Sequence, residues 1–531
     1  MSLTRRTFIN QMGMAAAGLA LVPSMAKAFQ TKNLVGVALP RSTPELQGMS
    51  SAAINAFLDA IEKSGIQFHS LMIVRNGSVV TEGWWAPYSA PQKHTLYSLS
   101  KSFTSSAVGF AIAEGKFTLE STVLSFFPDD KPAEVSANLA AMKVKHLLSM
   151  GTGHAKDTTA SLRETPDTIT WAKKFLALPV ESEPGTRFLY NTGATYMLSA
   201  IVQKATGQNV LEYLKPRLLE PLGIEGMDWE NNSEGVAVGG YGLRVRTEDI
   251  AKFGLLYLQK GKWNGKQILP AAWIEDATTS HIDNSTVRPK GKTPDDDWAQ
   301  GYGYQFWRCT HNAVRGDGAF GQFCIMMPEQ NTVVAITSES FDLQGSMNLI
   351  WNNLLTAFNV SAQPKNLAAI GLLQGRLSKL AITLPKANKT SPIATRISGK
   401  KYVLKENDFK MQSVSFQFNP DHTLITLTDD QGDKKIKCGI NAWMIEKDFK
   451  TQTLFPLKNR PVVATPIAAS VTWTDDNTLV LTIRYSETAH GDQITFGFES
   501  NNVGLRFLHS VAKGNPNTVE ARGVITGSLQ A

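Results

Sequence analysis

From about residue 395 to its end, the chain consists almost entirely of short β-rich runs, and this texture constrains the fold more than any other feature. Asp, Asn and Gly, the residues that end strands and form tight turns, separate the runs. The runs read KKYVLKE, SVSFQFN, TLITLTD, KIKCGI, SVTWTDD, TLVLTIRY, QITFGFE and VGLRFLH. Short strands at this spacing are typical of an all-β barrel or sandwich. We therefore predict a separate β domain over residues 395–531.

The preceding region, residues 44–360, alternates helix-like and strand-like segments. Its first strands, in SLMIVRNGSVVTEGWW, are joined by Asn76-Gly77, a hairpin signal because both residues tolerate positive φ. Helices are expected at 50–63, 103–114, 194–206, 208–219, 247–260 and 345–358, and the later strands are GYGYQFWRC, FGQFCIMMP and TVVAITSES. This order predicts an α+β fold in which two parts of one sheet meet across an inserted helical region. Residues 363–394 are expected to form a helical connector.

The N-terminus has the pattern of an export signal. Arg5 and Arg6 precede an apolar run over 12–22, and Ala26-Lys27-Ala28 offers a small-x-small cleavage site. The segment over 4–9 also resembles a twin-arginine signal, and a general secretory signal is the alternative. Residues 1–28 are thus predicted to be a signal peptide, which gives a periplasmic or secreted mature chain beginning near Phe29.

Charge and apolar content exclude two classes of partner. Removing the three cations of the signal lowers the formal net charge from +7 to +4, which over about 500 residues gives no case for a nucleic-acid partner. No second long apolar stretch follows the signal, so no membrane span is expected in the mature protein. The oligomeric state is not specified by these features.

The three cysteines and nine histidines show no metal-ligand spacing, so neither a metal nor an organic cofactor is predicted. Cys309 and Cys324 lie in consecutive expected strands. They could form a disulfide bond, or both could be buried thiols.

The pattern Ser-x-x-Lys occurs four times, beginning at Ser24, Ser98, Ser398 and Ser510. Only Ser98 is followed by a clear helical stripe, so Ser98 and Lys101 are expected to share one helix face. The positive end of the helix would favour an oxyanion, and a buried lysine could accept the hydroxyl proton. The alternative is that Ser98 caps the helix and Lys101 is a solvated charge.

Three longer segments extend this pattern. GTGHAKDT follows VKHLLSM, then comes EPGTRFLYNTGATYMLSAIVQKATGQNVLEYLKPRLLEPLGI, and then GGYGLRVRTEDIAKFGLLYLQKGKWNGKQILP. In this order they resemble the serine β-lactamase and penicillin-binding superfamily, in its class C β-lactamase, DD-carboxypeptidase and esterase branch. The resemblance implies a β-lactamase/transpeptidase-like sheet flanked by helices over residues 29–362. It also implies that Ser98 is the nucleophile.

The same resemblance assigns further site residues. Tyr190 matches the tyrosine of the family's Tyr-x-Asn motif, and we expect the charge of Lys101 to lower its pKa. Whether Lys101 or Tyr190 is the general base stays open. Thr192 occupies the asparagine position of that motif, which puts amide recognition in doubt. Gly318 and Ala319 fall where the second oxyanion-hole N–H is expected.

The family's Lys-Thr-Gly motif is absent as such, and Arg315 is a candidate for the missing cation. This departure counts against a dedicated β-lactamase. We therefore predict an exported serine hydrolase that cleaves carboxylic esters or amides of small or short peptide-like substrates through an acyl-enzyme on Ser98. The alternatives are a DD-peptidase or β-lactamase, and a catalytically silent penicillin-binding-like protein.

Overall fold

The computed structural model describes residues 38–164, 168–285, 296–359, 361–385, 388–451 and 465–530. The predicted signal peptide, with Ser24 and the cleavage site near Ala28, lies outside the described residues. Within the described part of the chain, no helix combines the length and the apolar character needed to cross a bilayer.

The first domain is built on a six-stranded antiparallel sheet with the order β2-β1-β11-β10-β9-β8. Its strands are β1 (Gln67–Arg75), β2 (Ser78–Trp84), β8 (Trp307–Arg308), β9 (Val314–Gly318), β10 (Gln322–Met327) and β11 (Thr332–Glu339). Asn76 and Gly77 have φ values of 50° and 78°, so the predicted hairpin is confirmed. Pairing of β1 with β11 joins the early and late strands, which confirms one sheet meeting across a helical insertion.

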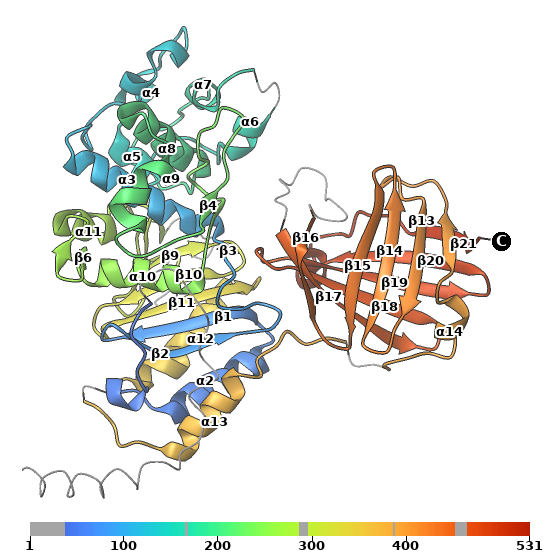
Figure 1. Ribbon diagram of the computed structural model, residues 1–531. Coiled ribbons are helices and arrows are strands. Elements are labelled where there is room, and N and C mark those ends of the chain that lie inside the picture. The colour runs from blue at the N-terminus through green and yellow to red at the C-terminus, as the bar shows by residue number, and fades with distance from the viewer. Residues whose placement is uncertain are drawn as a thin grey trace, which may run out of the picture. The chain divides into compact units, whose positions relative to one another are not determined.

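Helices cover both faces of this sheet (Figure 1). The helices α2 (Ser51–Ser64), α12 (Leu343–Leu354) and α13 (Leu367–Leu377) pack together on one face, and α10 (Thr247–Leu258) packs on the other. The ends of α2 follow local chemistry, because the Ser50 side chain accepts the Ala52 N–H and Gly65 takes a φ of 72°. Its apolar stripe then lies in a core shared with β1, β10 and β11.

The helical insertion follows β2. Its helices are α3 (Ser100–Ala113), α4 (Ala137–Ala141), α5 (Val144–Leu148), α6 (Thr159–Arg163), α7 (Trp171–Leu176), α8 (Thr192–Thr206), α9 (Val210–Leu214) and α11 (Ala271–Thr278). Small sheets accompany them: β3 (His94–Thr95), β5 (Leu243–Val245) and β4 (Asp228–Trp229), and the hairpin of β6 (Lys262–Trp263) and β7 (Lys266–Gln267). Helix α3 is buried along most of its length and packs against α8. It is the central helix of the site described below.

The C-terminal region is a closed β-barrel, so the predicted separate barrel or sandwich is a barrel. Its strands are β12 (Lys401–Leu404), β13 (Ser413–Phe418), β14 (His422–Asp429), β15 (Gly432–Ile440), β17 (Thr465–Asp475), β18 (Thr478–Tyr485), β19 (Gly491–Glu499), β20 (Asn502–His509) and β21 (Ile525–Leu529). Pairing of β15 with β17 closes the ring, and β16 (Met444–Thr451) adds to the edge of β17. Short helices α14 (Ala394–Ile397) and α15 (Ser510–Gly514) accompany the strands.

The structure does not test the predicted domain boundaries as such, and they stay predictions. In the predicted connector, α13 packs on α2 and contributes Leu373 to the core of the first domain. Residues from Ala394 onward contribute to the core of the barrel.

Cys309 and Cys324 do not lie in adjacent strands, because β9 separates β8 from β10 and Cys324 is paired with Gly316. The expectation of consecutive strands was therefore wrong. Both residues are buried free thiols, and the Cys324 Sγ lies 3.4 Å from the Ile250 carbonyl oxygen.

Candidate active site

Ser98 and Lys101 lie side by side at the start of α3. Ser98 belongs to a 3₁₀ turn over Tyr97–Leu99, and Lys101 is in the first turn of the α-helix that follows. The Lys101 Nζ lies 3.0 Å from the Ser98 Oγ, and the residue is only 1% exposed. The N-cap of α3 is Leu99. The alternative of a capping serine beside a solvated lysine was therefore wrong.

Lys101 is held at three points, which fixes its ammonium beside the serine. Besides Ser98, its Nζ contacts the Thr192 Oγ1 at 3.2 Å and the Gly240 carbonyl oxygen at 2.8 Å. Burial lowers the pKa of Lys101 to about 7, although the charges of Asp157 and Asp317 oppose this shift. A substantial share of Lys101 is therefore neutral near pH 7 and able to accept a proton.

Tyr190 lies on the other side of this lysine, at the entry to α8. Its ring centroid is 4.9 Å from the Lys101 Nζ, and its ring stacks on Trp307 at a centroid distance of 5.3 Å. Burial raises the pKa of the Tyr190 phenol well above its usual value, Asp317 adds to this, and a hydrogen bond with Ser98 opposes it. The predicted lowering of this pKa was wrong, because desolvation outweighs the nearby cation. The phenol therefore stays protonated at neutral pH.

The structure distinguishes the two polar residues after Tyr190. Asn191 is fully buried, and its Oδ1 accepts hydrogen bonds from the N–H and hydroxyl of Thr158. Thr192 instead directs its hydroxyl to Lys101. Thr192 thus lies beside Lys101, while Asn191 holds the loop around Thr158. The substrate-binding role of Thr192 stays a prediction.

Strand β9 packs directly against the turn that carries Ser98. A Cβ added to Gly318 would lie 2.1 Å from the Leu96 carbonyl oxygen, and one added to Gly316 would lie 2.5 Å from the Leu99 side chain. Only glycine permits this approach of strand to turn. Gly318 ends β9, and the exposed Ala319 follows it. Their role as the second oxyanion-hole donor stays a prediction.

Arg315 does not occupy the position proposed for it. Its side chain is fully buried, its Nε donates to the Asp317 carboxylate at 2.9 Å, and its guanidinium lies 4.0 Å from the Trp298 ring centroid. It pairs with Asp317 and so is not presented to solvent as a substitute for the missing lysine. The hypothesis of a substrate-binding cation at this residue is therefore wrong.

The two other Ser-x-x-Lys serines that the structure describes are placed differently. Ser398 follows α14 in the barrel, where its hydroxyl accepts the Phe418 N–H. Ser510 begins α15, so our expectation that it has no helix was wrong. Its hydroxyl donates to Glu339 and accepts the Gly491 N–H.

Sequence reasoning missed two backbone features of the site. The Gly240 carbonyl that accepts from Lys101 comes from Gly239-Gly240, and a Cβ on Gly240 would lie 2.6 Å from the Thr192 side chain. The double glycine in the sequence could have indicated this close approach. The second feature is the backbone of Tyr97, whose φ of 47° is a conformation that bulky residues rarely adopt. The residue types around Tyr97 gave no indication of this conformation.

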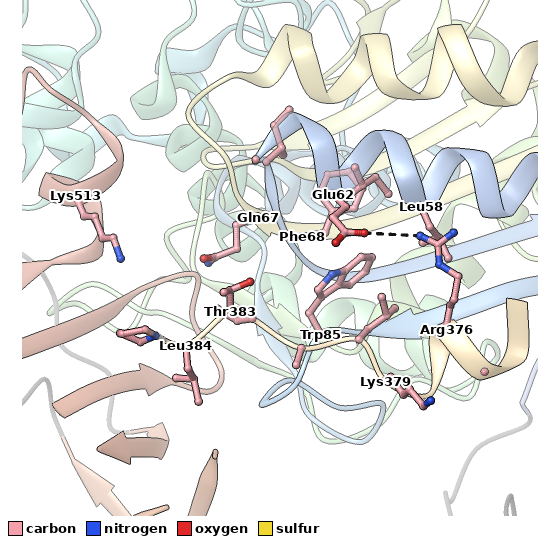
Figure 2. Close-up of a pocket in the computed structure, with 18 of the residues that line it drawn as sticks. Leu58, Glu62, Gln67, Phe68, Trp85, Arg376, Lys379, Thr383, Leu384 and Lys513 are labelled. Atoms are coloured by element: carbon pink, nitrogen blue, oxygen red, sulfur yellow. Dashed lines mark ion pairs between the residues drawn. The ribbon is translucent and has the colours of Figure 1, made fainter. Parts of the chain in front are cut away.

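The site is distinct from the large pocket drawn in Figure 2. That pocket has a volume of about 1170 Å³ and is lined by α2, the start of β1, the connector and barrel residues such as Lys513. An ion pair between Glu62 and Arg376 lies along it (Figure 2). Neither Ser98 nor Lys101 nor Tyr190 lines it.

The comparison with known protein families gives a match over most of the first domain. The family model described as Beta-lactamase matches residues 53–357, more than half of the chain. The chain belongs to this Beta-lactamase family. The match begins before Ser98 and Lys101 and ends in the short turn after α12, so it includes all the candidate site residues named above.

Relatives within and around this family are distant. The 6-aminohexanoate-dimer hydrolase of Paenarthrobacter ureafaciens is 23% identical over 282 residues, which make up 50% of this chain and 71% of that protein. A family VIII carboxylesterase structure is 15% identical with a TM-score of 0.46, and covers 60% of this chain and 99% of that chain. The octameric penicillin-binding protein homologue from Pyrococcus abyssi is 17% identical with a TM-score of 0.45. The alignment covers 89% of this chain and 99% of that chain. At these TM-scores neither structure assigns a role to any residue of this chain.

Among the described residues, no group of three or more His, Cys, Asp or Glu side chains is arranged to hold a metal ion.

Proposed function

We propose that this protein is an exported serine hydrolase that cleaves carboxylic esters or amides through an acyl-enzyme on Ser98. The observation that carries the proposal is the 3.0 Å contact between Ser98 and a buried lysine whose pKa burial lowers to about 7. A serine hydroxyl becomes a nucleophile only when a nearby base takes its proton. A lysine that is largely protonated at neutral pH could not do so.

The opposite pKa shifts of the two neighbours suggest their roles. Neutral Lys101 accepts the Ser98 proton as Oγ attacks the substrate carbonyl carbon, and the oxyanion is held by the N–H groups of Ser98 and Ala319. Tyr190, still protonated, donates to the leaving alkoxide or amine and is reprotonated by Lys101. Water then attacks the acyl-enzyme, its proton passes to the lysine and tyrosine pair, and Ser98 regains its hydroxyl.

The choice of esters or amides rests on what surrounds this pair. The third-motif lysine is replaced, and Arg315 is buried against Asp317, so this arginine is not free to bind a substrate carboxylate. This favours small or less anionic acyl groups over β-lactams and D-Ala-D-Ala termini. The 23% identical relative named as a 6-aminohexanoate-dimer hydrolase supports including amides among the substrates.

The test is hydrolysis of p-nitrophenyl acetate and butyrate by residues 29–531, compared with Ser98→Ala and Ser398→Ala. Loss of the nucleophile should reduce kcat by about 10³-fold or more. Ser398→Ala is the matched control, because it removes a Ser-x-x-Lys serine from the barrel and should leave turnover unchanged. Equal rates for wild type and Ser98→Ala would contradict the proposed mechanism for esters.

Covalent labelling separates the alternatives. A fluorophosphonate should label wild type and not Ser98→Ala, because only an activated serine reacts. Labelling by fluorescent penicillin together with hydrolysis of β-lactams, but not of esters, would favour the DD-peptidase or β-lactamase alternative. Absence of any labelling would favour a silent binding protein.

Export is the part of the proposal that rests on Arg5 and Arg6. Replacing both with lysine should retain the precursor in the cytoplasm if the signal is of the twin-arginine type. Continued export of this variant would indicate the general secretory route.

A further inference from the structure

One of the barrel segments that contact the first domain is a short loop, residues 486–490 between β18 and β19, here called the docking loop. The Glu487 carbonyl oxygen accepts the Thr95 N–H at 2.9 Å, and the Thr488 carbonyl oxygen accepts the Tyr88 hydroxyl at 2.9 Å. The Glu487 carboxylate also pairs with Arg244 at 2.8 Å. These contacts place the docking loop beside β3, immediately before the turn that carries Ser98.

The last residue of the docking loop reaches the neighbour of the nucleophile. The His490 Nε2 lies 2.7 Å from the Tyr97 hydroxyl, and the imidazole is nine-tenths buried. On its other side, the His490 Nδ1 lies 2.8 Å from a carboxylate oxygen of Glu339, at the end of β11. Tyr97 thus connects to the sheet of its own domain through a side chain of the barrel.

The charge of Glu339 fixes the direction of the hydrogen bond from His490. Burial alone would raise the pKa of this carboxyl, but the hydrogen bond from His490 and the charge of Arg484 lower it to about 2. An ionised carboxylate only accepts, so the His490 Nδ1 donates to it. The His490 Nε2 and the Tyr97 hydroxyl form the second hydrogen bond of this connection.

Tyr97 needs such support because its backbone is unfavourable. Its φ of 47° is rare for an aromatic residue, and such conformations persist only where the surroundings impose them. On the side of β9 its Cβ lies 3.1 Å from where a Gly318 Cβ would stand, and its ring packs edge-on against Phe320. The His490 ring packs edge-on against both Tyr97 and Phe320. The residue before Ser98 is therefore held by contacts with the β9 side of the sheet and with the barrel.

We propose that His490 is a positioning residue: through the Tyr97 hydroxyl it holds the turn that presents Ser98 to Lys101 and to the oxyanion site. The barrel thereby completes the active site of the first domain without touching substrate. The hydrogen bond between His490 and Tyr97 is observed in the structure. Its effect on catalysis rests on the function proposed above. A shift of the nucleophile by a fraction of an ångström is enough to slow an acyl transfer strongly.

The first test measures the rate of fluorophosphonate labelling of Ser98 and the kcat for p-nitrophenyl butyrate in His490→Ala, His490→Gln and Tyr97→Phe. We expect His490→Ala and Tyr97→Phe each to lower both rates by about 10-fold or more with little change in KM. His490→Gln should recover part of the loss, because its amide can form a hydrogen bond with the Tyr97 hydroxyl. The double variant should be no slower than the slower single variant, because both remove one contact.

His422→Ala is the matched control, since His422 is a barrel histidine that also contacts a carboxylate, that of Asp421. It should leave labelling and kcat unchanged. Tyr97→Phe keeps the aromatic packing, so it remains informative if His490→Ala folds poorly. Additive losses in the double variant, or unchanged rates in both single variants, would overturn the proposal.

The second test does not depend on catalysis. Deuterium uptake of a peptide spanning residues 92–99 should be about 10-fold faster in His490→Ala than in wild type and His422→Ala, because the Thr95 N–H is hydrogen-bonded to the docking loop. If the wild type hydrolyses no ester but His490→Ala still exchanges faster than the wild type, the serine hydrolase proposal fails while the positioning contact holds. Equal exchange in all three proteins would overturn the positioning role whatever the activity.

Discussion

At the scale of single residues, we expect the burial of Lys101 to make the proposed hydrolysis dependent on pH. Because its pKa is lowered to about 7, kcat/KM for p-nitrophenyl acetate should rise as pH increases through about 7 and level off above about 8. Lys101→Arg, which stays protonated over this range, should lose about 10³-fold or more of the plateau rate. Lys252→Met is the control: it removes another buried lysine of lowered pKa, on α10, and should leave the midpoint unchanged.

The same shift has a consequence for stability. Between pH 7 and the ordinary lysine pKa of 10.5, the unfolded chain binds a proton at Lys101 and the folded chain does not. Stability contributed by this residue therefore rises with pH across that window and falls as pH drops toward 7. Lys101→Met should remove this rise in urea-unfolding curves, and a slope equal to that of wild type would contradict the assignment.

Tyr190 and Lys101 are separated experimentally by their opposite pKa shifts. Tyr190→Phe keeps the stacking on Trp307 and removes the proton donor, so kcat for the ester should fall by about 10²-fold. The pH midpoint near 7 should remain, because it belongs to the lysine. Loss of that midpoint in Tyr190→Phe would make the tyrosine the base instead. Tyr302→Phe, a buried tyrosine beside Tyr190, should have little effect on kcat.

At the scale of elements, the close packing of β9 on the turn at Ser98 depends on glycine. Gly318→Ala would place a Cβ 2.1 Å from the Leu96 carbonyl oxygen, so strand and turn must separate. We expect a loss of about 1–3 kcal/mol in the free energy of unfolding, and a fall in Ser98 labelling of about 10-fold or more. Gly504→Ala, in β20, has open space around its Cβ and serves as the control. If Gly318→Ala and Gly504→Ala change stability and Ser98 labelling equally, the close packing of β9 on the turn has no special role.

The elements also show what the sequence could and could not reveal. The Asn76-Gly77 hairpin follows from local chemistry and was predictable. The spacing of Ser98 and Lys101 left two interpretations open, and the choice between them came from the family resemblance of the longer segments. The pKa of Tyr190 was misjudged because burial depends on packing by distant residues such as Trp307. The contact of Tyr97 with His490 joins positions 393 residues apart, so no local pattern could indicate it.

At the scale of the whole molecule, Glu339 connects the sheet of the first domain to the barrel. One carboxylate oxygen accepts from Arg484 at 2.6 Å, and the other accepts from His490 and from Ser510. All three of these donors belong to the barrel. The side chains of Arg484 and Glu339 are each at least nine-tenths buried. A buried carboxylate that loses its cation is left without compensation, which costs far more than losing a surface ion pair.

Arg484→Met should therefore lower the free energy of unfolding by about 3–5 kcal/mol at pH 7. In wild type the pKa of Glu339 lies near 2, below its ordinary 4.5, so its charge contributes stability above pH 4.5 that is lost as pH falls toward 2. Without the arginine this pKa rises, and the carboxyl takes up a proton as pH decreases from 7. The stability gap between variant and wild type should consequently narrow between pH 7 and pH 4.5, as measured by urea unfolding.

Lys410→Met, which breaks the exposed pair with Asp430, should cost at most about 1 kcal/mol at either pH. A gap that stays constant with pH would mean that Glu339 is not the group that Arg484 stabilises.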